Sequence, residues 1–273
     1  MVGGSATTHK FNLKDPRDVD AAYRLQFNGG WTHGSNGATP NGTTAYANTY
    51  LIPNDTFNVT NLAAFGYYSL TSVASVPRDY VMGAYTNGRG SMAMVIKRTN
   101  ENYYTTAMID FPSGTSYRQV ELSPNPYTGD GLYMASQQGT NFKFLRNTTL
   151  IGQNGIVSTN TQQSTHPIFI GALNGNGSAV DYTNKVCAFS FLSDKLSDSE
   201  ATSFYNAVQK FNTFLGRQVG TPIYNTNGLV LNLDAGNANS YPGTGTTWYD
   251  LASGKNATLL NGPTYNTNGS LLL

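Results

Sequence analysis

The chain has 273 residues, a formal net charge of +1 and only 11% charged residues, less than half of the roughly 25% found in an average soluble protein. This length can bury a substantial hydrophobic core. Because clustered Lys and Arg are needed to attract phosphate backbones, nucleic acid is not an expected partner. No run approaches the ~18 apolar residues of a membrane span, and the N-terminal MVGGSATTHK lacks the apolar region of a signal peptide. We therefore expect no membrane partner, and synthesis in the cytoplasm without a signal peptide.

Residues 1–20 are polar and predict an N-terminal connector. The segment 28–42, NGGWTHGSNGATPNG, is rich in Gly and Asn and predicts a loop. Short apolar segments then recur at the spacing typical of sandwiches and barrels, with turn pairs such as Asn87-Gly88 and Asn174-Gly175 between them. The predicted strands are 21–27, 45–51, 63–69, 79–85, 91–97, 104–110, 117–122, 131–136, 142–146, 148–152, 167–173 and 185–192.

No helical period occurs before Ser197, and parallel sheets need a helix or another long crossover between strands. The strands should therefore pair antiparallel and pack as two layers. The predicted fold class is all-β, an antiparallel two-sheet sandwich with one C-terminal helix. Cys187 is the only cysteine, so no internal disulfide forms, and its apolar run VCAFSF predicts a core position.

The segment 197–217, SDSEATSFYNAVQKFNTFLGR, has a clear helical period. Ser197 and Glu200 have the spacing of a capping box, and Gly216 is a typical helix terminator. One apolar stripe should cover an exposed side of the β-structure. We expect its members to include Phe204, Phe211 and Leu215.

Residues 218–227 have the composition of a linker, and GLVLNLDAGNANSYPGTGTTWYDL then begins new strand and turn signals at Gly228. The segment ATLLNGPTYNTNGS echoes YRLQFNGGWTHGSNG near the start. About 45 residues are too few to bury a sandwich core alone. We expect 228–273 to be either the start of a second, incomplete module of a longer protein or a tail that adds a strand to a neighbour's sheet.

The stretches GLYMASQQGTNFKFLRNTTLIGQN, PIFIGALNGNG and KVCAFSFLSDKLSDSEATSFYNAVQKF resemble the closing half of a laminin-G-like, concanavalin-A-type jelly roll. The segment 2–51 is similar to modules of bacteriophage virion proteins and related bacterial surface proteins. The segment 228–265, with its WYDL, resembles the first third of another such module in phage tail, neck and capsid-associated proteins. The resemblance implies a laminin-G-like jelly-roll domain over 21–217 and an unfinished second one over 228–273.

The spacing of the Asp and Glu residues does not predict an enzyme. Concanavalin-A-type glycosidases place two acids two residues apart on one strand, so that both carboxylates face the sugar. Only Asp18/Asp20 and Asp198/Glu200 have this spacing, and these pairs lie in the connector and at the helix start. We therefore expect no catalytic residues.

Metal-binding signals are also weak. His9, His33 and His166 are far apart in the sequence, and none has a second ligand at metal spacing. We expect no cofactor, although loop carboxylates could hold one structural calcium ion. The aspartates that could each give it one ligand are Asp130, Asp181 and Asp234.

A glycan site would use exposed aromatic side chains that stack on sugar rings. The alternative is that these rings alternate on strands and lie in the core or at an interface. The candidates are Trp31, in the Gly-rich segment, and Tyr103, Tyr104, Tyr117 and Tyr127.

The leading hypothesis is a non-enzymatic structural protein of a phage virion, in the tail, neck, fibre or capsid decoration, exposed on the particle surface. Its expected partners are other virion proteins and further copies of itself in a homo-oligomer. The phage context rests on the resemblance. The alternative hypothesis is a carbohydrate-binding adhesion module that recognises a host surface glycan, and a third is a glycosidase of the concanavalin-A-like fold.

Overall fold

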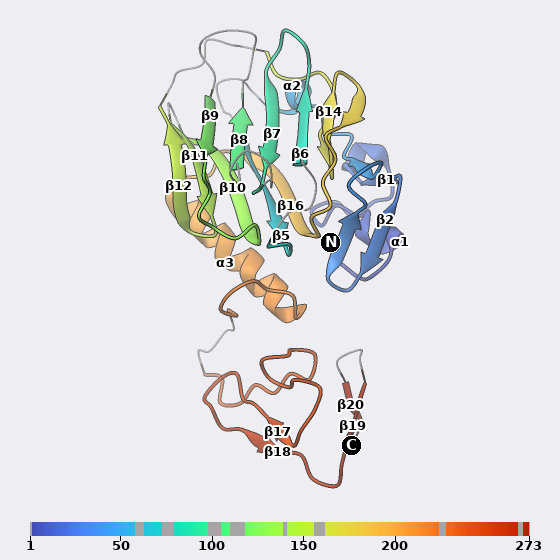
Figure 1. The fold of residues 1–273 in the computed structure, drawn as a ribbon, viewed down its shortest axis with the longest axis vertical. Helices are drawn as coiled ribbons and strands as arrows, with labels where there is room; N and C mark the ends of the chain where they lie inside the picture. Colours follow the sequence, from blue (N-terminus) through green and yellow to red (C-terminus); the bar gives the residue numbers. More distant parts are fainter. Residues whose placement is uncertain are drawn as a thin grey trace. The chain divides into compact units, whose positions relative to one another are not determined.

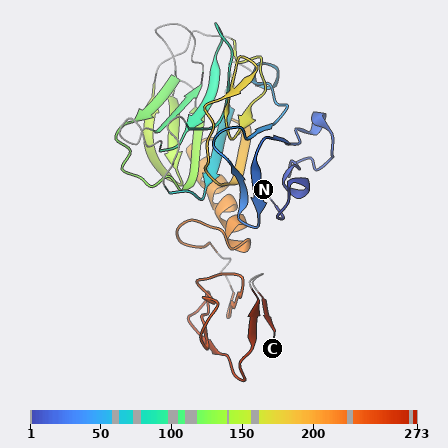
Figure 2. The same ribbon diagram turned by 45° about the vertical axis from the view of Figure 1, so that its right-hand side comes forward.

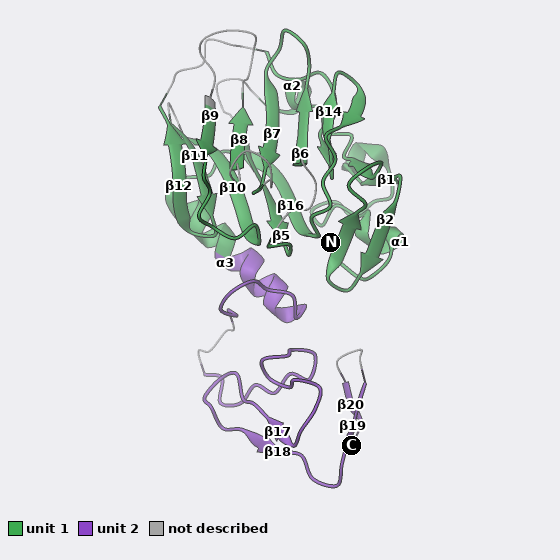
Figure 3. Ribbon diagram, in the orientation of Figure 1, with its two compact units in different colours: residues 1–205 green, residues 206–273 purple. Residues whose placement is uncertain are grey.

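The structure is a computed structural model and describes residues 2–57, 63–72, 79–97, 105–109, 118–138, 141–155, 162–223, 228–266 and 270–272. The chain divides into two compact units, residues 1–205 and 206–273, coloured separately in Figure 3. The division falls inside the long helix α3 (Asp198–Phe214). None of the described helices is long and apolar enough to cross a membrane.

Two large sheets face each other in the first unit, as Figures 1 and 2 show from two directions. The nine-stranded sheet runs β1 (Gln26–Asn28), β4 (Tyr46–Asn48), β13 (Phe169–Ile170), β6 (Tyr80–Tyr85), β7 (Ser91–Val95), β8 (Thr105–Ile109) and β9 (Arg118–Leu122), with β14 (Leu173–Gly175) beside β6 and β15 (Ser178–Val180) beside β14. The seven-stranded sheet runs β12 (Thr149–Asn154), β11 (Asn141–Arg146), β10 (Gly131–Gln138), β5 (Ala63–Ser69), β16 (Cys187–Asp194), β3 (Gly37–Pro40) and β2 (Trp31–Gly34). The short helices are α1 (Ala6–His9), the 3-10 turn η1 (Asp20–Ala22) and α2 (Pro53–Thr56).

The predicted all-β jelly-roll sandwich with one amphipathic C-terminal helix is confirmed. One described strand pair departs from the expected antiparallel pattern, because β14 runs parallel to β6. The chain reverses at Gly171 (φ 89°), so β13 and β14 lie against the same edge of β6 in opposite directions. A residue with a side chain is strained at this φ.

The loop predicted over 28–42 is wrong, because β2 and β3 form a hairpin there. The Gly and Asn residues of this segment are typical of loops, but the segment forms two short strands, with Gly37 at φ 127° beside the turn. The strand predicted from Ala21 begins only at Gln26, since η1 occupies the preceding residues. The turn predicted at Asn174-Gly175 lies two residues later, at Asn176-Gly177, where both residues have positive φ as a tight hairpin turn requires.

The hydrophobic core lies between the two sheets. Each fully buried aromatic side chain stabilises the fold by roughly 1.5–3 kcal/mol. Cys187 is buried in this core, as predicted. The largest side chains are Phe65, Tyr67, Tyr133, Phe142 and Phe144 from one sheet and Met82, Met92, Met94, Ile96 and Ile109 from the other.

Helix α3 begins with the predicted capping box. The Ser197 N–H donates to Glu200 Oε2 (2.8 Å), and the Glu200 N–H donates to Ser197 Oγ (3.3 Å). At the other end the N–H of Arg217 donates to the Asn212 carbonyl (3.0 Å), with Gly216 at φ 67°. This Schellman pattern confirms the predicted terminator.

The predicted apolar stripe of α3 is only partly buried. Phe204 packs on the outer face of the seven-stranded sheet, with ring centroids 4.3 Å from Phe191 and 6.2 Å from Phe189. Phe211 is half-buried, with the Arg217 guanidinium 5.7 Å from its ring centroid. The prediction for Leu215 is wrong, because the helix has already ended at Phe214 and Leu215 is exposed.

Replacing Phe204 with alanine should therefore destabilise the first unit by about 1.5–3 kcal/mol, since it removes a half-buried ring from a three-ring contact. Chemical denaturation of the full chain measures this. Phe214 on the same helix is 69% exposed, so Phe214→Ala is the matched control and should cost less than about 0.5 kcal/mol. Equal losses for the two variants would contradict the assigned contact.

The second unit is built around the Asp250 carboxylate of the WYDL motif. It accepts hydrogen bonds from the N–H groups of Asn232 (2.7 Å), Ala252 (2.9 Å), Ser253 (2.9 Å) and Lys255 (3.0 Å), and from Ser253 Oγ (2.8 Å). Its strands form two small hairpins: β17 (Thr247–Trp248) with β18 (Ala257–Thr258), and β19 (Thr264–Asn266) with β20 (Ser270–Leu272).

The second unit also leaves large apolar side chains exposed, among them Val230, Leu231, Leu260 and Leu272. New strand signals were expected from Gly228, but none of the described strands begins before β17 in this unit. Completion by further chain or by strand addition stays a prediction.

Candidate functional site

A hollow lies on the outer face of the nine-stranded sheet. Because side chains alternate along a strand, the core residues Met92, Ala107 and Val120 place their neighbours on that outer face. The hollow has a volume of about 340 Å³, within the roughly 300–1,000 Å³ typical of small-ligand sites. Its lining residues are Tyr80, Tyr85, Ser91, Ala93, Met108, Gln119 and Leu173.

The floor lies along a row of paired residues in which the first two, Gly83 and Ala93, are small. Gly83 on β6 pairs with Ala93 on β7, which pairs with Met108 on β8, which pairs with Gln119 on β9. A Cβ at Gly83 would lie 2.6 Å from the Ala93 Cβ. The two strands can therefore hold this register only with glycine at one of the positions, and the missing side chain leaves the depression.

Two tyrosines of β6 bound this floor, with Tyr80 and Tyr85 on either side of Gly83. Both are half-buried, so each presents part of its ring to the hollow. The Tyr85 hydroxyl donates to Asn87 Oδ1 (3.1 Å) in the following turn, which fixes its ring. Such rings supply apolar faces together with a polar hydroxyl, the combination that suits a partly hydrated ligand.

Ser91 supplies a buried hydroxyl at the side of the hollow. It pairs with Tyr85 across β6 and β7, and the residue is only 2% exposed. Its Oγ has no hydrogen-bond partner among the described residues. A buried hydroxyl without a partner costs about 1–3 kcal/mol, and native structures keep few of them. A ligand hydroxyl in the hollow would remove this cost.

Gln119 places an amide at the opposite side. Its Nε2 donates to Thr106 Oγ1 (3.2 Å) and to Glu121 Oε2 (3.2 Å), so the donor end of the amide is held by neighbouring outer-face residues. None of the seven lining residues carries a charge, and the nearest charge in this network is the Glu121 carboxylate behind Gln119. The hollow therefore disfavours an anionic ligand.

The predicted glycan residue Trp31 lies elsewhere, at the edge of the core. Its indole Nε1 donates to the Tyr46 carbonyl (3.2 Å), and its ring packs edge-on against Phe27 at 5.1 Å. A Cβ at Gly171 would come within 2.9 Å of the indole, so the ring lies closely on that backbone. These contacts give Trp31 a packing role.

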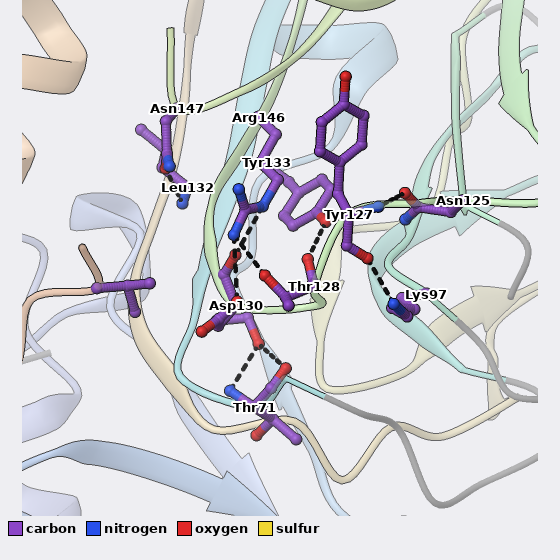
Figure 4. Close-up of polar contacts among 12 residues, drawn as sticks. Thr71, Lys97, Asn125, Tyr127, Thr128, Asp130, Leu132, Tyr133, Arg146 and Asn147 are labelled. Atoms are coloured by element: carbon purple, nitrogen blue, oxygen red, sulfur yellow. Dashed lines mark hydrogen bonds and ion pairs between the residues drawn. The ribbon is translucent and has the colours of Figure 1, made fainter. Parts of the chain in front are cut away.

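Tyr127 lies in the loop before β10, where polar contacts fix the backbone (Figure 4). Lys97 Nζ donates to its carbonyl (2.6 Å), and the Asn125 side chain accepts from its N–H (2.8 Å). The Arg146 guanidinium lies 5.9 Å from its ring centroid. Tyr127 is half-buried and is not among the residues that line the hollow.

Arg146 and Tyr133 hold the rest of this loop. Arg146 donates to the Asp130 carbonyl (3.0 Å) and to Thr128 Oγ1 (2.6 Å), and the Tyr133 hydroxyl donates to the Thr128 carbonyl (2.6 Å). Burial raises the pKa of Tyr133 to about 12, so its hydroxyl stays a donor. Figure 4 shows both side chains directed at the same loop. The loop is thus held in place by side chains of β10 and β11.

The predicted residues Tyr103, Tyr104 and Tyr117 lie outside the described residues. Of the predicted calcium ligands, Asp130 pairs with Arg146 (3.2 Å), and Asp234 accepts from the Gly236 N–H (2.9 Å) within the second unit. Asp181 follows β15 at φ 52°. Within the described ranges no three His, Cys, Asp or Glu side chains gather as a metal site would require. Calcium binding stays a prediction.

The structure brings together two histidines that the sequence left apart. His9 Nδ1 lies 3.0 Å from His33 Nδ1, and His9 Nε2 lies 3.2 Å from the Gly3 carbonyl. A neutral His9 that donates from Nε2 accepts at Nδ1, so His33 donates to it. Burial lowers the pKa of His33, which favours its neutral form.

The fold and the hollow together define a β-sandwich with a ligand-sized depression on one sheet face. No protein-family model and no curated protein matches the chain. Among solved structures it is similar to the CBM40 module of the Ruminococcus gnavus IT-sialidase, with 10% identity and a TM-score of 0.40 over 54% of this chain and 83% of that chain.

It is also similar to the receptor-binding domain of a botulinum neurotoxin C/D mosaic serotype, with 11% identity and a TM-score of 0.49 over 68% of this chain and 47% of that chain. A third structure concerns botulinum neurotoxin type C, whose cell entry depends on two ganglioside molecules, with 9% identity and a TM-score of 0.46 over 69% of this chain and 48% of that chain. The chain spans about half the length of these toxin chains. With every TM-score below 0.5, these similarities define no ligand for this chain. They give the expected phage context no support, and it stays a prediction.

Proposed function

We propose that the first unit is a carbohydrate-binding module whose site is the hollow on the nine-stranded sheet. The observation that carries this proposal is the buried Ser91 hydroxyl at the side of the hollow, which lacks a hydrogen-bond partner among the described residues. A sugar offers many hydroxyl groups on a compact ring, so it can satisfy Ser91 while its C–H face rests on the tyrosine rings and the Ala93 floor.

The lining favours a neutral sugar. An acidic sugar would bring a carboxylate close to the Glu121 side chain, and none of the described lining residues is a cation that would compensate for its lost hydration. The amide of Gln119 and the hydroxyl of Ser91 instead match the hydroxyl groups of a neutral pyranose. The proposed role is therefore recognition of neutral glycans, without catalysis.

Isothermal titration of the full chain with glucose, galactose, mannose, N-acetylglucosamine and sialic acid tests this proposal. We expect at least one neutral sugar to bind and sialic acid not to bind. Ser91→Ala should weaken the neutral sugar about 5–10-fold, the equivalent of one lost hydrogen bond. Ala93→Leu should abolish binding, because leucine fills the floor while the opposite face of β7 stays in the core.

Tyr249→Ala is the matched control, since Tyr249 is an exposed tyrosine of the second unit and its loss should leave the affinity unchanged. Circular dichroism confirms that each variant is folded. Absence of binding by all five sugars at millimolar concentration, or unchanged affinity in Ala93→Leu, would refute the proposal. Preferential binding of sialic acid would refute the neutral specificity.

A further inference from the structure

Asp79 and Lys185 form a charged pair in the interior of the first unit. The Lys185 Nζ lies 2.8 Å from Asp79 Oδ2, and both side chains are 0% exposed. Asp79 immediately precedes β6 in the nine-stranded sheet, and Lys185 lies two residues before β16 in the seven-stranded sheet. The contact therefore spans the sandwich between central strands of its two layers.

The surroundings of this pair are buried. The fully buried Tyr67 donates its hydroxyl to the Lys185 carbonyl (2.7 Å), and the buried Cys187 follows two residues later. The Lys185 Nζ makes no aligned hydrogen bond within the described part of the chain, although it lies at contact distance from the carboxylate. An ammonium group has three N–H donors, and this arrangement gives none of them a well-aligned acceptor among the described residues.

The protonation of Lys185 is correspondingly perturbed. Burial lowers the pKa of the Lys185 amine, and the Asp79 carboxylate opposes that shift. In a low-dielectric interior, transfer of one proton from the Lys185 ammonium group to the carboxylate gives a neutral pair without a desolvated charge. A neutral, desolvated lysine amine is a nucleophile.

We propose that Asp79 and Lys185 join in an intramolecular amide bond. After the proton transfer, the Nζ lone pair attacks Asp79 Cγ and the C–N bond forms. The C–O bond to the protonated oxygen then breaks, and the hydroxyl leaves with one proton from the nitrogen as water. The condensation needs no oxidant, reductant or further reactant, and it leaves one neutral amide where two charged groups stood.

The cross-link would close the chain from Asp79 to Lys185 into a covalent loop that contains most strands of the nine-stranded sheet and β10, β11 and β12 of the seven-stranded sheet. Cross-links over long loops restrict the unfolded chain strongly, as disulfides do. Cys187 is the only cysteine, so a disulfide cannot supply this restraint within the chain. The proposed bond is independent of the glycan hollow, because neither residue lines it.

Intact mass spectrometry of the folded, purified full chain tests the proposal. We expect a mass lower than that of the sequence by one water, about 18 Da. A tryptic digest should contain one branched peptide that joins Asp79 to Lys185, since trypsin does not cleave after an acylated lysine. A mass equal to that of the sequence would overturn the proposal and leave a buried ion pair.

Variants give a second readout. Lys185→Gln and Asp79→Ala should each restore the full mass expected from their own sequence, whether or not they stay folded. Asp79→Asn should instead lose ammonia, about 17 Da, because the amide nitrogen becomes the leaving group. Lys143→Gln is the matched control, since Lys143 pairs with the exposed Asp198 (2.7 Å) and should keep the 18 Da deficit. If the mass deficit persisted in Lys185→Gln, the cross-link would lie elsewhere in the chain, and the assignment to Asp79 and Lys185 would be refuted.

Discussion

Replacing Gly66 with alanine is expected to destabilise the first unit by about 1–3 kcal/mol, the range of an overpacked interior position. A Cβ at Gly66 would lie 2.5 Å from Phe191 Cε1 and 2.6 Å from the Tyr133 carbonyl oxygen. The Phe191 ring occupies the space above Gly66 and in turn packs against Phe204 of α3. The new methyl group must therefore displace either the helix contact or the backbone of β10.

Chemical denaturation of the full chain measures this loss. Gly34 is the matched control, because a Cβ there would meet nothing within 4 Å. Gly34→Ala should change the free energy of unfolding by less than about 0.5 kcal/mol. A Gly66→Ala variant as stable as the wild type would show that Phe191 does not lie over the glycine.

The second large effect is expected at Asp250. Burial by itself would raise the pKa of this carboxyl. Hydrogen bonds from Asn232, Ala252 and Ser253 together lower the pKa by more than burial raises it, so the pKa lies well below its usual range. A pKa lower in the folded than in the unfolded chain contributes stability that is fully present above about pH 4. This contribution is lost as the pH falls toward the folded-state pKa.

Amide hydrogen exchange of residues 228–266, followed from pH 6 to pH 2 and corrected for intrinsic rates, measures this dependence. Protection of the donors to Asp250 should fall on acidification, and Asp250→Asn should be poorly protected at every pH. Asp234→Asn is the control, since the Asp234 carboxylate accepts one described hydrogen bond, from the Gly236 N–H. Full protection in Asp250→Asn would refute the role of this carboxylate in holding the unit together.

The fold was largely predictable because most strands carry a local signal. Segments such as 63–69 and 91–97 combine apolar content with turn residues at both ends, and they became β5 and β7. The capping box and Gly216 likewise act through neighbours in sequence. The β2–β3 hairpin was missed because its Gly and Asn residues favour loops, and the extended form depends on pairing of β2 with β3 and of β3 with β16.

The site was not predictable because its residues meet only through register. Ala93 and Met108 carry no signal of binding by themselves, and Gly83 is one of 29 glycines. They form a hollow because pairing aligns β6, β7 and β8 with their small residues side by side. The aromatic signal pointed to Trp31, which packs against Phe27, and its role in glycan binding stays a prediction. In the same way, Asp79 and Lys185 meet only when the two sheets close.

The order of strands in the sheets has a consequence for how the chain folds. β16 lies between β3 and β5, and β13 lies between β4 and β6, so each sheet receives a late segment of the chain in its interior. The early strands cannot form a continuous sheet until residues 169–194 have been synthesised. Such non-local pairing slows folding and leaves strand edges exposed meanwhile. During synthesis, the nascent first unit should therefore depend on chaperones until β16 has inserted.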